Sequence, residues 1–101
     1  MEMAASEMNE AVAKKLGWLQ RSDGWELPPM RGLFPLKDYC HSIEAAWEIV
    51  DYLKANKISF DLNMSMFETE DIWEARMRGP IIWAMAQTAP MAICQAFLKL
   101  P

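Results

Sequence analysis

The chain of 101 residues has room for one domain, and its 52% hydrophobic and 24% charged residues are the balance of a globular protein. That balance excludes a disordered acidic tail, which would lack the apolar surface to offset its chain entropy. Ten Lys and Arg against fourteen Asp and Glu give a net charge of -4, the opposite of a domain that grips a phosphate backbone. We therefore expect a single domain over residues 1–101 that binds no nucleic acid directly.

The cysteines and the apolar segments indicate the compartment. Cys40 and Cys94 lie far apart and match no CxxC or Cys/His metal-ligand spacing, which favours a reducing environment. The acidic start of the chain lacks the basic and apolar parts of a signal peptide. The longest apolar stretch, residues 81–86, is far shorter than the roughly 20 residues of a membrane span. We expect a cytosolic protein that does not enter a membrane.

The first part of the chain predicts a helix followed by a small hairpin. Residues 2–16 repeat apolar side chains at helical spacing, and Gly17 is typical of a helix end. Residues 18–21 and 25–27 are short apolar-aromatic runs on either side of an Asp-Gly turn, a pattern that favours a β-hairpin.

A loop and a second helix come next. Residues 30–41 carry Gly and Pro without a clean period, which indicates a loop. Ser42 is a typical N-cap, and the helix that it starts is expected to run to about Ala55. The predicted core stripe of this helix is Ile43, Ala46, Trp47, Val50 and Leu53.

The second half predicts three strands and a last helix. Residues 58–66 alternate apolar and polar side chains, Glu68–Asp71 is a charged turn, and the alternation resumes at 73–78. Residues 81–86 are apolar on both faces, as in a strand in the middle of a sheet, and Thr88 is a candidate cap of the final helix. The predicted inner face of the first two strands is Ile58, Phe60, Leu62, Met64, Met66, Trp73, Ala75 and Met77.

The expected order is therefore α-β-β-α-β-β-β-α. Segregated helices and hairpin-joined strands predict an α+β fold, with helices packed on a mostly antiparallel sheet. Three helices exceed what one face of so small a sheet needs, so we expect one of them to cover the second face.

Several segments, in this order, resemble the phage ABA sandwich family. They are Asn9–Trp18, which is a helix ending in Gly-Trp, Pro35–Tyr39, Ala45–Val50, Trp73–Arg76 and Thr88–Ala96, and together they span nearly the whole chain. The resemblance implies an α/β/α sandwich encoded by a tailed phage or prophage, which acts in the cytoplasm of the bacterial host. It implies no established activity and no catalytic residues.

One thiol–imidazole neighbour pair, Cys40-His41, is a candidate for nucleophilic catalysis or metal binding. Adjacent residues seldom point toward one another, so a small hydrolase would need Cys40, His41 and an acid to meet in one pocket. Cys40 can also meet Cys94 in the fold. Neutral packing is the usual fate of such residues. We expect no enzyme activity, no metal site and no cofactor.

Two features are candidate partner-binding sites. The first is the acidic turn and its flanking strand, where Glu68, Glu70, Asp71 and Glu74 can meet a basic surface or simply stay solvated. The second is the hairpin, which is too small to bury both tryptophans and continues into an apolar loop. Its candidate residues are Trp18, Trp25, Met30 and Phe34. Trp47 and Trp73 are expected in the core.

These observations favour a non-enzymatic phage accessory protein that binds a host protein or protein complex. The most concrete version is an anti-defence protein, such as an inhibitor of a host CRISPR–Cas complex. The alternative is a homo-oligomeric structural or regulatory protein of the phage, or a small-molecule-binding protein.

Overall fold

The computed structural model describes residues 4–28, 31–66, 71–79 and 81–101. The elements are α1 (Ala5–Leu16), β1 (Leu19–Arg21), β2 (Gly24–Glu26), α2 (Ile43–Ala55), β3 (Phe60–Met66), β4 (Asp71–Met77), β5 (Ile82–Ala86) and α3 (Ala89–Lys99). This order confirms the predicted sequence of helices and strands and the α+β class.

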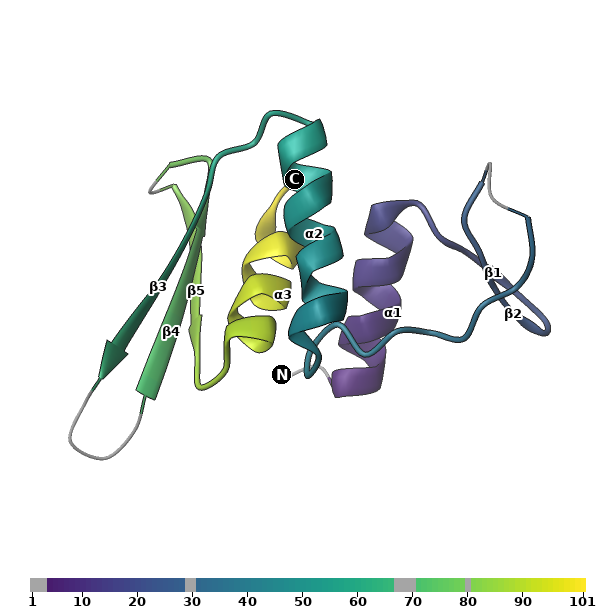
Figure 1. The fold of residues 1–101 in the computed structure, drawn as a ribbon, viewed down its shortest axis with the longest axis horizontal. Coiled ribbons are helices and arrows are strands. Elements are labelled where there is room, and N and C mark those ends of the chain that lie inside the picture. The colour runs from purple at the N-terminus through teal and green to yellow at the C-terminus, as the bar shows by residue number, and fades with distance from the viewer. Residues whose placement is uncertain (1–3, 29–30, 67–70, 80) are drawn as a thin grey trace.

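The helices form a layer between two separate antiparallel sheets (Figure 1). One sheet is the β1–β2 hairpin, and the other has three strands in the order β3-β4-β5. All three described helices lie on the same side of the three-stranded sheet (Figure 1), so the expected helix on its second face is wrong for the part of the chain that is described. β5 is an edge strand and not the middle strand that its apolar sequence predicted.

The predicted helix ends are confirmed in position. Gly17 adopts a φ of 106°, a left-handed conformation that suits glycine, and the N–H of Trp18 returns to the carbonyl of Ala13. At the start of α2 the Ser42 hydroxyl oxygen accepts a hydrogen bond from the backbone N–H of Ala45 at 3.2 Å. Thr88 occupies the N-cap position of α3, but its side chain makes no capping hydrogen bond.

The face that α2 buries differs from the predicted stripe. Its buried residues are Ala45, Ala46, Ile49 and Leu53, whereas Ile43 and Trp47 are 46% and 48% exposed. The prediction of Ile43 and Trp47 as core residues is therefore wrong. Apolar side chains cover most of the circumference of this helix, so their spacing alone defines no single face. α2 packs against α3, and its buried face carries two small alanine side chains.

One part of the core lies between α3 and the inner face of the three-stranded sheet, and the core continues through the helix layer to the hairpin. Ala75 and Met77 of β4 are fully buried against α3, which contributes Ile93 and Phe97. The predicted alternation is confirmed over most of β3 and β4, but Met64 is 44% exposed. The far end of the β3–β4 hairpin extends beyond the end of the helix layer (Figure 1).

The outer face of the three-stranded sheet is open. Trp83 and Met85 of β5 are each 48% exposed, and they lie across from Arg76 and Glu74 of β4. Their exposure explains why β5 is apolar on both sides without being a central strand: its inner side chains pack on α3, and its outer ones remain uncovered.

Candidate functional site

The hairpin tryptophans are core residues. Trp18 and Trp25 are each 6% exposed, so the expectation that the hairpin cannot bury both is wrong. The loop after β2 returns along the hairpin, and Phe34 exchanges two backbone hydrogen bonds of 2.8 Å with Trp25. The Phe34 ring also meets Trp18 edge-on at 6.0 Å. This returning loop supplies the cover that the two short strands lack.

Asn9 fastens that loop to α1. Its side-chain amide donates to Asp38 Oδ1 at 3.0 Å, and its carbonyl oxygen accepts the backbone N–H of Cys40 at 3.0 Å. The hydrogen bond from Asn9, with a further contribution from His41, holds the pKa of Asp38 below its usual range. Asn9 is not among the residues predicted from the sequence, where its one signal is a polar side chain directly beside the apolar stripe of its helix.

The thiol and the imidazole do not form a dyad. His41 Nδ1 lies 3.0 Å from Asp38, while the fully buried Cys40 thiol donates to the carbonyl of Ala5 and lies beside Cys94. Burial raises the pKa of both thiols, which keeps them protonated and unreactive near neutral pH. In the described ranges no three His, Cys, Asp or Glu side chains gather as metal ligands.

The acidic turn is seen in part. Glu68 and Glu70, like Met30 of the predicted aromatic patch, lie outside the described residues. Asp71 is exposed, but Glu74 is partly buried and accepts a hydrogen bond from Arg76 Nε at 2.7 Å. Glu74 therefore has a neutralising partner within its own strand.

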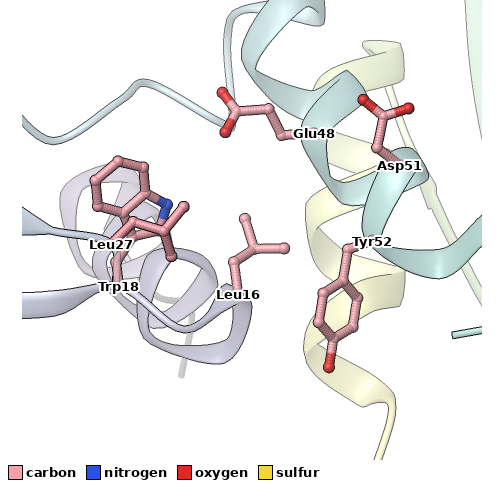
Figure 2. Close-up of a pocket in the computed structure, with 6 residues that line it drawn as sticks. All are labelled: Leu16, Trp18, Leu27, Glu48, Asp51 and Tyr52. Atoms are coloured by element: carbon pink, nitrogen blue, oxygen red, sulfur yellow. The ribbon is translucent and has the colours of Figure 1, made fainter. Parts of the chain in front are cut away.

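A hollow of about 320 Å³ opens where α1, the hairpin and α2 meet. It is lined by Leu16, Trp18, Leu27, Glu48, Asp51 and Tyr52. Figure 2 shows the two leucines and the tryptophan on one side and the three α2 residues on the other. The wall opposite α2 is therefore apolar, while α2 brings two carboxylates and a phenol.

The helix period explains why the polar groups gather. Glu48, Asp51 and Tyr52 are spaced i, i+3 and i+4, so they share one face of α2. Tyr52 is held by an edge-on contact with the Phe97 ring at 5.5 Å. The opposite wall follows from the Gly17 turn, which reverses the chain between the last residue of α1 and the hairpin.

Lys37 lies at the border of the hollow. Its ammonium is 2.5 Å from Glu48 Oε2 and 5.7 Å from the centre of the Trp18 ring. Asp51, by contrast, makes no ion pair with any residue that the structure describes. Two carboxylates against one ammonium leave one negative charge here.

The carboxylates continue along α2. Glu44 precedes Glu48 by one turn, and exposed Ile43 and Trp47 flank it on a shallow apolar patch. We call Glu44, Glu48, Asp51, Ile43 and Trp47 the outer face of α2. The sequence predicts Ile43 and Trp47 in the core and no site residue among the acids of α2. Of the residues of the outer face and the hollow, Trp18 alone is a predicted site residue.

Comparison with known proteins identifies the family. The model of the Phage ABA sandwich domain matches residues 10–98. The crystal structure of a phage protein from Bacillus cereus ATCC 14579 is similar, with a TM-score of 0.68 and 25% sequence identity over 96% of this chain and 91% of that chain. No curated protein matches. No described helix is long and apolar enough to cross a membrane. The family and the crystal structure indicate a phage-encoded protein. The chain belongs to the Phage ABA sandwich domain family.

Proposed function

We propose that this phage-encoded protein acts without catalysis, by binding a basic protein partner through the outer face of α2. The observation that carries the proposal is the row formed by Glu44, Glu48 and Asp51 beside an exposed tryptophan. Carboxylates steer a positively charged partner, and tryptophan supplies much of the binding energy at protein interfaces. This surface replaces the hairpin tryptophans as the apolar part of the candidate site.

The class of partner that fits best is a host defence complex in the bacterial cytoplasm, most concretely a CRISPR–Cas effector. Such a complex guides nucleic acid along basic grooves, which an acidic protein can block. The net charge of -4 and the phage family support this partner. The family alone does not fix the function, because one fold serves many functions.

The test is phage plating on hosts that express this protein together with a defined CRISPR–Cas system. We expect a targeted phage to plate better in the presence of the protein and the purified effector to bind it. The variant Trp47→Ala/Asp51→Lys should lose both effects. The control is Asp61→Lys, which makes the same charge change at an exposed position of β3, away from α2, and should retain both effects. Unchanged plating together with no effector binding contradicts the proposal.

A second candidate is a homo-oligomeric phage protein. It is favoured by the open face of the three-stranded sheet, where Trp83 and Met85 are half exposed and Ile81 is 77% exposed. Lys99 of α3 donates to the Trp83 carbonyl at 2.9 Å and lies 5.5 Å from its ring, so the edge strand is already engaged at that point. Analytical ultracentrifugation of the wild type and of Trp83→Lys separates self-assembly from binding of a host protein. A defined wild-type oligomer that dissociates in the variant favours self-assembly.

A further inference from the structure

We infer that the hollow between the hairpin and α2 receives one lysine or arginine side chain of the partner protein. This inference rests on the proposed function and specifies what its surface recognises. The alkyl stem of the incoming side chain lies against Leu16, Leu27 and the Trp18 ring. Its charge lies near Glu48 and Asp51.

The size of the hollow limits what it can hold. Sites for drug-sized ligands and cofactors span about 300 to 1,000 Å³, so a hollow of about 320 Å³ is at the lower limit of that range. It is also open to solvent and not an enclosed cavity. A single long side chain entering from a partner surface matches both properties better than an enclosed small molecule.

The chemistry of the walls selects an amphipathic cation. Long basic side chains bury their methylene groups on apolar surface while the charged end stays near water and acids. The hollow presents that combination, because the apolar Leu16 and Leu27 line it together with the acidic Glu48 and Asp51. A neutral polar side chain can donate a hydrogen bond to a carboxylate but forms no ion pair with it, and an acidic side chain is repelled.

The chain itself supplies an example of the expected contact. The ammonium of Lys37 pairs with Glu48 and lies over the ring of Trp18, as a ligand cation would. Both residues of this pair are partly exposed, so the contact is exchangeable. Asp51 has no ion pair with a described residue, so a cation of the partner can pair with it directly. The same cation competes with Lys37 for Glu48.

The experiment is a titration of the 15N-labelled full chain with blocked arginine and blocked lysine, followed by NMR. We expect saturable shifts of the Trp18 indole N–H and of the backbone amides from Glu48 to Tyr52. Blocked glutamine, which has no charge, should not produce them. Asp51→Asn should weaken the binding about 2- to 5-fold, the range of an exposed ion pair, and Lys37→Met should strengthen it to a similar extent. Asp61→Asn makes the same charge change on β3 of the three-stranded sheet and should have no effect.

Three results would overturn the inference. The first is the absence of saturable shifts with either basic compound, and the second is an equal response to blocked glutamine. The third is saturation by free spermidine at concentrations where the blocked amino acids produce no shift, which would identify a polyamine as the ligand. The plating assay fails independently of this titration: binding in the hollow without any effect on plating removes the defence complex as partner but keeps the site.

Discussion

The hairpin and the outer face of the larger sheet differ in whether their tryptophans are buried. The hairpin has strands of three residues and buries both Trp18 and Trp25. The larger sheet has strands of five to seven residues and leaves Trp83 half exposed. The amount of sheet therefore does not decide whether an aromatic ring is buried. An aromatic ring is buried where another segment of the chain covers that face of the sheet.

For the hairpin that segment is the loop from 31 to 41. It pairs with β2 through Phe34 and is fastened to α1 through Asn9. For the outer face of the larger sheet no described segment plays this part. A long-range contact of this kind leaves no periodic signal in the sequence, so the sequence alone predicts an exposed hairpin.

The sharpest test of this comparison replaces one tryptophan on each side. Trp25→Ala should lower the free energy of unfolding by about 3–5 kcal/mol, the usual effect of removing a buried aromatic ring. Trp83→Ala should cost about 1 kcal/mol, because half of its surface is already in water and the Lys99 contact is exposed. Urea denaturation of both variants measures the difference. Equal losses would show that the hairpin is not part of the core.

The fastening of the loop gives the next largest effect. Asn9→Ala leaves the buried backbone N–H of Cys40 without its acceptor, and we expect a loss of about 1–3 kcal/mol in the free energy of unfolding. The control is Asn63→Ala on the exposed face of β3, which should change stability by less than about 0.5 kcal/mol. If Asn9→Ala were as mild as the control, the loop would be held by its apolar side chains alone.

These residues also show how far the sequence can be interpreted. The Gly17 turn, the Ser42 cap, the order of the elements and the alternation in β4 are local signals, and all were confirmed. The buried face of α2, the edge position of β5 and the hollow depend on which elements pack together. The spacing of Glu48 and Asp51 was visible in the sequence, but nothing indicated that Leu16 and Leu27 would lie opposite them.

The pH dependence of stability tests whether the covering loop keeps water away from the buried thiols. Burial raises the pKa of Cys40 and Cys94 in the folded state, so the unfolded chain loses these protons at lower pH. Above the unfolded thiol pKa of about 8.5 the unfolded state binds fewer protons, and stability falls by up to about 1.4 kcal/mol per pH unit for each thiol. Burial also raises the pKa of Tyr39, which adds to the loss near its unfolded value of about 10.

Urea denaturation at several values between about pH 7 and pH 10 measures this slope. Cys94→Ala should reduce the slope by the share of one thiol, whatever its effect on stability at neutral pH. A flat profile in the wild type would mean that water reaches the thiols and that the loop opens readily.

The smallest expected effect on stability comes from the N-caps of two helices. α2 follows the covering loop of the hairpin, and α3 follows β5 of the larger sheet. Ser42→Ala removes a capping hydrogen bond and should cost about 1 kcal/mol. Thr88→Ala removes no such bond, so its cost should stay below that of Ser42→Ala, although Thr88 holds the same position at its helix. Thermal or urea denaturation of the pair measures the difference. Because the loop is fastened at Cys40 and α2 begins only three residues after it, a frayed α2 would also loosen the cover of the hairpin. The Ser42 variant should therefore speed the hydrogen exchange of the Trp18 indole N–H, followed by NMR, and the Thr88 variant should leave it protected.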